Sequence, residues 1–142
     1  SAVGAVTRLV DMGVEPFLLS SSLIGVVAQR LVRVLCLACR EEHIADKAEC
    51  ALLGVKVANP PTIYRSAGCA QCNQRGYKGR TGIYEVVSIN DTLRRLIHER
   101  GLEQELETEA RVHGPSIRQD GMVKVLAGIT SLDEVLRVTR ED

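Results

Sequence analysis

Two cysteine pairs place the strongest constraint on how this chain can fold. Cys36 and Cys39 form the first pair, and Cys69 and Cys72 form the second. Each pair encloses two residues, so one tight turn can direct both sulfur atoms to a common point. Two such turns together supply four thiolates in a tetrahedron, the coordination that Zn²⁺ prefers, with Zn–S distances of about 2.3 Å. Sulfur ligands without a carboxylate favour zinc or an iron–sulfur cluster over calcium or magnesium.

The same four cysteines are compatible with alternatives to zinc. An iron–sulfur cluster also takes four cysteines, and two unmetallated thiol pairs or two disulfides use the same residues. Disulfides require an oxidising compartment, and the sequence shows no signal peptide. The separation between the pairs, residues 40–68, exceeds that of an ordinary zinc ribbon and predicts an inserted element. Because four cysteines leave no open coordination position for water, the predicted metal is structural rather than catalytic.

Other residues near the pairs are weaker candidates. Cys50 lies outside both pairs and is predicted to be a buried or idle thiol, and His43 is predicted to be a solvent-exposed histidine rather than a ligand. Four thiolates on one zinc carry two net negative charges. The nearby bases that could offset them, or simply be solvated, are Arg33, Arg40, Arg75, Lys78 and Arg80.

Composition restricts the partners that the chain can have. Lys+Arg and Asp+Glu are both 18, so bulk charge gives no reason to bind nucleic acid. Aromatic residues make up 3% of the chain, too few for base-stacking platforms, which counts against the alternative of a nucleic-acid-binding zinc ribbon. The longest apolar run, residues 17–28, is interrupted by serines and is shorter than the roughly 20 residues of a membrane span. We therefore predict a soluble chain without a transmembrane segment in a reducing compartment.

Hydrophobic periodicity predicts an α+β chain that is mainly helical. The helices are expected over residues 1–12, 16–29 and 46–53, after Asn90 as far as Gly101, over 102–112 and 116–127, and from Ser131 onward. The strands are expected over residues 30–35, 62–65 and 79–89, with the first and last paired. Ser116–Gln119 and Ser131–Glu134 each have the spacing of a helix capping box.

The segments that flank the cysteines resemble the type II secretion ATPases, the general secretion pathway protein E family. Type IV pilus assembly ATPases are close relatives of that family. The resemblance covers essentially the whole chain and rests on residues 4–9, 13–18, 28–33, 76–85 and 128–132 together with the four paired cysteines.

The resemblance implies an architecture of three parts. Residues 1–35 would be the C-terminal end of a RecA-like ATPase domain, 36–89 a tetracysteine zinc-binding subdomain, and 90–142 a C-terminal helical subdomain. The full-length protein would be a cytoplasmic homo-hexamer, peripheral on the bacterial inner membrane, that hydrolyses ATP to drive pseudopilus assembly. Inner-membrane platform proteins of the secretion machine would be its partners. A fragment of a type IV pilus assembly ATPase is the alternative within the same family.

The phosphate-binding elements of such an ATPase are missing from this sequence. No run of the form Gly-x-x-x-x-Gly-Lys-Ser/Thr occurs in it. ATP and Mg²⁺ would therefore be cofactors of the full-length parent only, and the isolated chain is predicted to be an inactive structural or docking module. Arg8 is the candidate phosphate-contacting arginine, acting in the full-length protein, because a planar cation can stabilise transition-state charge. The alternative is that Arg8 makes a salt bridge on a helix surface.

Overall fold

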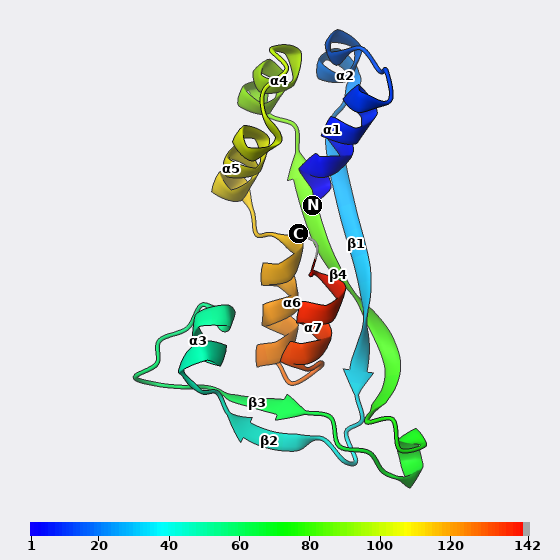
Figure 1. The fold of residues 1–142 in the computed structure, drawn as a ribbon, viewed down its shortest axis with the longest axis vertical. Helices are drawn as coiled ribbons and strands as arrows, with labels where there is room; N and C mark the ends of the chain where they lie inside the picture. The colour runs from blue at the N-terminus through cyan, green and yellow to red at the C-terminus, as the bar shows by residue number, and fades with distance from the viewer. Residues whose placement is uncertain (141–142) are drawn as a thin grey trace. The chain divides into compact units, whose positions relative to one another are not determined.

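The computed structural model describes residues 1–140 and has the mixed helix-and-strand composition predicted from the sequence (Figure 1). In chain order the elements are α1 (Ala2–Asp11), α2 (Pro16–Ser22), β1 (Gly25–Leu35), β2 (Glu41–Ile44), α3 (Lys47–Leu53), β3 (Thr62–Arg65), the 3₁₀ turn η1 (Ala70–Cys72), β4 (Tyr77–Ser88), α4 (Asp91–His98), α5 (Glu103–His113), α6 (Ile117–Leu126) and α7 (Leu132–Val138). Within residues 1–140, every helix is too short or too polar to cross a membrane.

The chain divides into two compact units, each built from segments that are distant in sequence. Unit 1 contains residues 1–29 and 84–117, and unit 2 contains residues 30–83 and 118–140. Strands β1 and β4 contribute to both units and pair with each other, as predicted. They run in opposite directions (Figure 1), and hydrogen bonds mark both ends of the pairing, from Ile89 N to Ile24 O and from Cys36 N to Gly76 O, each 3.0 Å long.

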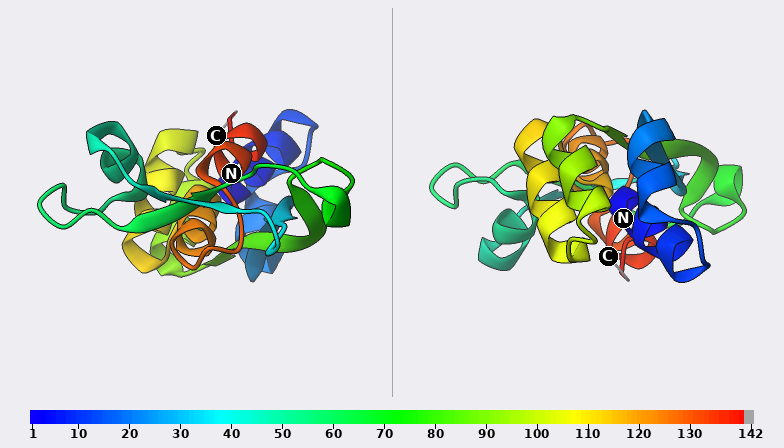
Figure 2. Two further views of the ribbon diagram at one scale, coloured as in Figure 1. Left: turned by 90° about the horizontal axis from the view of Figure 1, so that it is seen from below. Right: turned by 90° about the horizontal axis from the view of Figure 1, so that it is seen from above.

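Unit 1 is a group of four helices around an aliphatic core. Helix α4 contacts α2 and α5, and α5 contacts α1 (Figure 2). Helix α4 begins as predicted, because the Asn90 side chain accepts a hydrogen bond of 2.8 Å from Leu93 N. The buried core is formed by Ala2, Val3, Val6, Leu19, Val87, Ile89, Leu93, Ile97, Leu106 and Ala110.

One prediction in unit 1 is wrong, because the helix expected over residues 16–29 ends at Ser22. The hydroxyl groups of Ser20, Ser21 and Ser22 bond back to the carbonyls of the preceding turn, which satisfies the end of the helix locally. The β-branched residues beyond it extend β1 back to Gly25, so the strand is longer than the 30–35 predicted. The serines therefore end the helix and the valines begin the strand, a change that the long apolar run in the sequence did not indicate.

Unit 2 contains a second sheet, part of which the sequence did not indicate. Strand β2 pairs antiparallel with β3, with Glu41 opposite Arg65 and Ile44 opposite Thr62. We did not predict β2, because its four residues are mostly polar and too few to show a periodic pattern. The helix predicted over 46–53 is confirmed as α3, which has a capping box at its start and a left-handed Gly54, at a φ of 72°, at its end.

Helices α6 and α7 close unit 2. They approach closely at Gly121, where an added Cβ would lie 2.5 Å from a Val135 methyl group. Ser131 caps α7 as predicted and accepts from Glu134 N at 3.1 Å. The second half of the predicted capping box is replaced by another contact, since the Glu134 carboxylate binds Arg33 and Arg137 instead.

Candidate metal centre

The fold brings the four paired cysteines together in unit 2. All four sulfur atoms lie within 4.8 Å of one another. The Sγ–Sγ distances are 3.9 Å from Cys36 to Cys69, 3.8 Å from Cys39 to Cys72 and 3.9 Å from Cys69 to Cys72. Four sulfurs placed tetrahedrally around zinc at about 2.3 Å would be about 3.8 Å apart. The observed spacing therefore fits one tetrahedral metal ion.

Four chain segments converge on this centre. Cys36 follows the last residue of β1, and Arg40, next to Cys39, precedes β2. Cys69 comes shortly after β3, and Cys72 ends the 3₁₀ turn that leads into β4. A metal held here would cross-link the ends of all four strands, which explains how a small two-stranded sheet is attached to the longer strand pair.

Backbone amides are directed at two of the sulfur atoms. Gly68 N donates to the Cys39 sulfur at 3.3 Å. The Cys72 sulfur accepts from Cys69 N at 3.3 Å and from Gly76 N at 3.1 Å. Such donors stabilise the thiolate, which is the form of cysteine that binds a metal. The turns are therefore arranged for negatively charged sulfur.

Two glycines permit this close approach of the backbone. Gly68 has a φ of 130°, and an added Cβ would lie 2.9 Å from the carbonyl oxygen of Gln74. Gly76 has a φ of 81°, and an added Cβ would lie 2.7 Å from the Cβ of Ser66. A side chain at either position would combine backbone strain with a steric clash. Both glycines are therefore requirements of the tetracysteine turns.

The environment separates the pKa values of two of the thiols. Burial raises the pKa of Cys39 to about 12, despite the hydrogen bond from Gly68. Burial also acts to raise the pKa of Cys72, but the backbone donors from Cys69 and Gly76 outweigh it and lower that pKa to about 6. The lowered pKa therefore favours the thiolate form of Cys72 near neutral pH. The raised pKa favours the thiol form of Cys39, so a metal ion would have to displace its proton.

Two of the bases considered as charge partners of the centre are engaged elsewhere in unit 2. Arg33 binds Glu134, and its guanidinium carbon lies 4.2 Å from the centroid of the Tyr77 ring. Arg40 donates to the carbonyl oxygen of Gly128. The other three bases, Arg75, Lys78 and Arg80, are exposed.

The two other candidates near the centre have different outcomes. Cys50 is fully buried on α3 and lies outside the four-cysteine group, which confirms it as a buried thiol. The prediction that His43 is solvent-exposed is wrong. Its side chain is only 24% exposed, and Nε2 lies 2.6 Å from a carboxylate oxygen of Glu49. The capping box of α3 turns Glu49 back toward β2, a contact that sequence spacing does not show.

Sequence reasoning also missed Glu134, whose side chain is fully buried. Its carboxylate accepts hydrogen bonds from Arg33 N at 2.8 Å, from the Arg33 guanidinium and from Arg137. These contacts attach α7 to β1 within unit 2. No clear signal in the sequence indicated this burial, because α7 also contains Asp133 and Arg137 and the capping-box spacing of Glu134 suggested a local role.

Arg8 belongs to unit 1, whereas the cysteines belong to unit 2. The Arg8 side chain is exposed on α1. Among residues 1–140, no hydrogen bond or ion pair engages that side chain. The helix-surface salt bridge considered as its alternative role is therefore not formed with any described residue.

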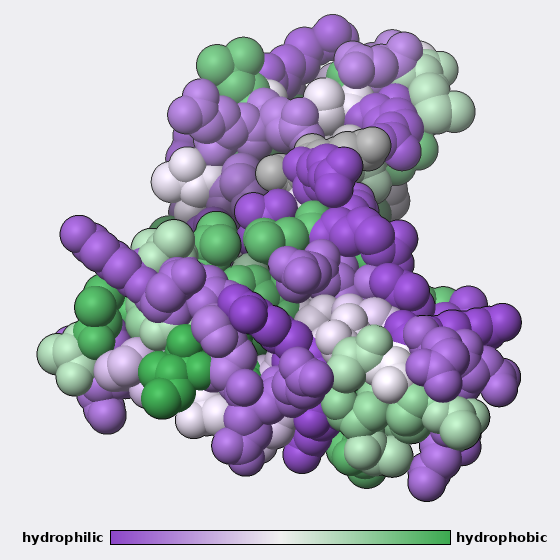
Figure 3. Space-filling model, turned by 60° about the horizontal axis from the view of Figure 1, so that its bottom comes forward, coloured by the Kyte–Doolittle hydropathy of each residue, from purple (hydrophilic) through white to green (hydrophobic). Residues whose placement is uncertain are grey.

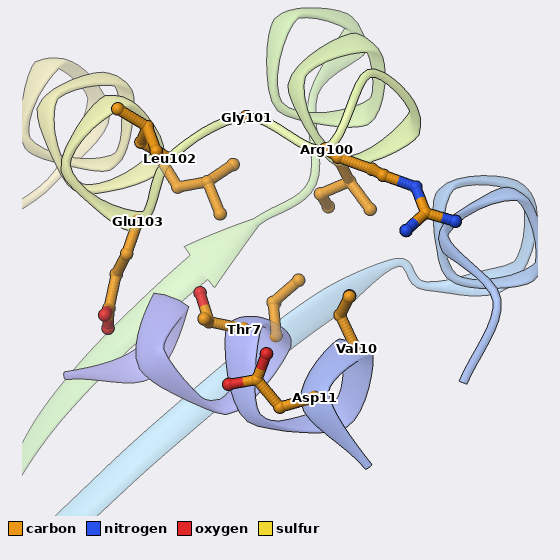
Figure 4. A pocket seen from close by; sticks show the side chains of 10 residues that line it. Thr7, Val10, Asp11, Arg100, Gly101, Leu102 and Glu103 are labelled. Carbon is orange, nitrogen blue, oxygen red and sulfur yellow. The ribbon is translucent and has the colours of Figure 1, made fainter. Parts of the chain in front are cut away.

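A pocket in unit 1 has a volume of about 220 Å³ and apolar lining residues that include Val6, Ile97 and Leu106. In Figure 4, Thr7 and Asp11 extend into it from α1, opposite Leu102 on the other wall. This volume is below the roughly 300–1,000 Å³ of ordinary ligand sites. The wall also lacks the glycine-rich phosphate loop that a nucleotide needs, because no such motif is present in the chain.

The surface of unit 2 displays several apolar side chains around α3. Figure 3 shows them in green on the left of the view, among hydrophilic residues. Ile44, Leu52 and Val57 are 66%, 45% and 51% exposed. Scattered apolar residues are common on protein surfaces, and these three give unit 2 a partly apolar face around α3.

Known proteins are similar to this chain over nearly its whole length. The family described as "Type II/IV secretion system protein" matches residues 1–137. Type II secretion system protein E of Pseudomonas aeruginosa is 65% identical over all 142 residues, which make up 28% of that protein. Type II secretion system ATPase E of Vibrio cholerae is 56% identical over 99% of this chain and 28% of its own length. The protein E of Aeromonas hydrophila is 54% identical over the whole chain and 28% of its length. The chain thus spans little more than a quarter of these relatives.

Proposed function

Because this chain belongs to the type II/IV secretion system protein family, we propose that it is the C-terminal part of an ATPase that powers type II protein secretion. The match over 99% of this chain to a protein named as a type II secretion system ATPase supports this assignment. In the whole protein, ATP hydrolysis would drive assembly of a pseudopilus. The described chain would supply a structural and interaction module, while ATP and Mg²⁺ would be bound by residues outside it.

The proposed architecture follows the family resemblance. Residues 1–35 complete a RecA-like ATPase domain, 36–89 form the zinc-binding subdomain, and 90–142 form a helical subdomain. The parent is a homo-hexamer in the cytoplasm, peripheral on the inner membrane and in contact with the platform proteins of the machine. The partly apolar face around α3 supports a docking role for the zinc-binding subdomain, because exposed apolar side chains suit protein contact and a bound zinc would hold the subdomain in place.

The tetracysteine centre holds structural Zn²⁺ in this proposal, and the sulfur spacing of 3.8–3.9 Å is the observation that carries it. All four ligands are thiolates, so zinc would supply a closed cross-link and contribute to folding. Elemental mass spectrometry should find one zinc per chain. A thiol titration of the unfolded protein should detect four more reactive thiols in the presence of chelator than in its absence. A metal-free protein with four freely reactive thiols in the folded state would refute the site.

A functional test must separate a structural zinc from a docking site. We propose replacing Cys36 by serine in the full-length ATPase, with Cys50→Ser as the matched control because Cys50 lies outside the centre. If the Cys36 variant loses folded protein while the Cys50 control does not, the centre has a structural role. Retained ATP hydrolysis with lost secretion indicates docking. Wild-type folding, ATPase rate and secretion in the Cys36 variant would contradict both roles.

Arg8 is proposed to contact phosphate in the full-length protein. The observation that supports this role is an exposed guanidinium that no described residue neutralises. Arg8→Ala should lower ATP turnover substantially, about 10²-fold or more if it stabilises transition-state charge, with zinc content unchanged. Arg95→Ala is the control, because Arg95 is also exposed in unit 1 but pairs with Glu99 at 3.3 Å. Equal turnover in the two variants would remove Arg8 from the catalytic machinery.

A further inference from the structure

We infer that Arg40 couples metal binding at the cysteines to the order of the turn between α6 and α7. This inference rests on the proposed zinc site and adds a positioning residue to it. Arg40 directly follows the metal-ligand candidate Cys39, so the cysteine turn fixes where its side chain starts. Its guanidinium reaches residue 128, which is 88 positions away in sequence but lies in the same unit.

The contact between Arg40 and the turn is specific. The Arg40 Nη1 atom donates a hydrogen bond of 2.7 Å to the carbonyl oxygen of Gly128. Its guanidinium carbon also lies 4.0 Å from the centroid of the Tyr64 ring on β3. A cation over an aromatic face is held in position by the ring electrostatics. Tyr64 therefore orients the guanidinium while Gly128 receives its hydrogen bond.

The turn is built to receive this arginine. Gly128 N donates to Val125 O and Ile129 N donates to Lys124 O, each at 3.0 Å, the pattern of a Schellman helix end. Gly128 has a φ of 76°, and an added Cβ would lie 2.7 Å from Arg40 Nη1 and 3.1 Å from the Tyr64 ring. Glycine is thus required both by the backbone conformation and by the approach of these two side chains.

A physical route therefore joins the metal centre to the C-terminal helices. With metal bound, the turn at Cys39 is fixed and Arg40 is held against Tyr64 and Gly128. Without metal, the cysteine turn at Cys39 gains conformational freedom. The hydrogen bond from Arg40 to Gly128 must then compensate the entropy cost of ordering the arginine side chain. Metal binding and order of the α6–α7 turn should stabilise each other. Because thermodynamic linkage is reciprocal, loss of the Arg40 contact must lower the metal affinity by the same factor as loss of metal lowers the stability of the α6–α7 turn.

The test uses amide hydrogen exchange of Gly128 and Ile129 measured by NMR, with zinc-loaded and chelator-treated protein. In the wild type, chelation should lower the protection of both amides about tenfold, the effect of losing one hydrogen bond to a charged group. Arg40→Met keeps the aliphatic stem and removes the guanidinium. Zinc-loaded Arg40→Met should already show this loss, and chelation should change it little further. Its zinc affinity, measured by competition with a chromophoric chelator, should fall about tenfold.

Arg75→Met is the matched control, because Arg75 is exposed and also follows a cysteine turn. It should behave like the wild type in both measurements. Wild-type protection and wild-type zinc affinity in zinc-loaded Arg40→Met would overturn the coupling, even with one zinc per chain. Absence of zinc from the wild type would overturn the proposed metal site itself, together with any coupling to it. The two failures are therefore distinguishable.

Discussion

Glu134 offers a sharp test of how α7 is attached to β1. Its fully buried carboxylate accepts hydrogen bonds from the backbone and side chain of Arg33 and from the side chain of Arg137. Burial acts to raise the Glu134 pKa, but the two guanidinium groups and the backbone donor outweigh it. They lower that pKa from 4.5 to about 2. A shift of this size corresponds to about 3 kcal/mol of folding free energy.

The sign of the pH dependence follows from the lowered pKa. The contribution is complete above the unfolded pKa of 4.5 and is lost as the pH falls toward about 2. Glu134→Gln should therefore lower the free energy of unfolding by about 3 kcal/mol at pH 7, and the deficit relative to wild type should shrink below pH 4.5.

Urea denaturation followed by circular dichroism measures this difference. Release of a metal ion from the proposed zinc site at low pH would affect both proteins, so the difference between variant and wild type is the relevant quantity. Glu99→Gln is the control, because Glu99 is 56% exposed in its pair with Arg95 and should change stability by less than about 1 kcal/mol. A deficit for Glu134→Gln no larger than that of the control, or one independent of pH, would refute the reasoning.

Three further predictions concern other parts of the chain. Cys50→Ala should cost about 1 kcal/mol of unfolding free energy through lost packing, with one zinc still bound by elemental analysis; loss of zinc would assign Cys50 to the centre. Arg94→Met should lower the thermal midpoint by several degrees, because Arg94 donates to the carbonyls of Ser20, Leu23 and Ile89 at the end of α2 and β4; an unchanged midpoint would show that these bonds are replaced by water. Gly76→Ala should weaken zinc binding in a chelator competition, since its Cβ would clash with Ser66, and equal affinity in variant and wild type would contradict the proposed packing of the turn.

Much of the metal centre could be predicted from the sequence. Two cysteine pairs with two intervening residues are a local pattern, and local turns direct their sulfurs regardless of the rest of the fold. The pairing of β1 with β4 was also predictable, because these strands lead into and out of the cysteine turns. The caps at Asn90 and Ser131 were likewise readable from spacing, since a cap depends on residues within one turn.

Other features were decided by contacts between distant segments. The apolar run after Pro16 suits a helix or a strand, and pairing with β4 selects the strand from Gly25 onward. The burial of Glu134 depends on Arg33, which is 101 positions away, and a capping-box spacing gave no indication of it. Arg40 likewise finds its acceptor at Gly128 only because residues 30–83 and 118–140 fold together. The sequence by itself determined which four cysteines form the candidate metal centre and most of the helices, because these depend on short-range geometry. Only the tertiary structure decided which charges are buried and which turns they stabilise, since those contacts join segments that the order along the chain keeps apart.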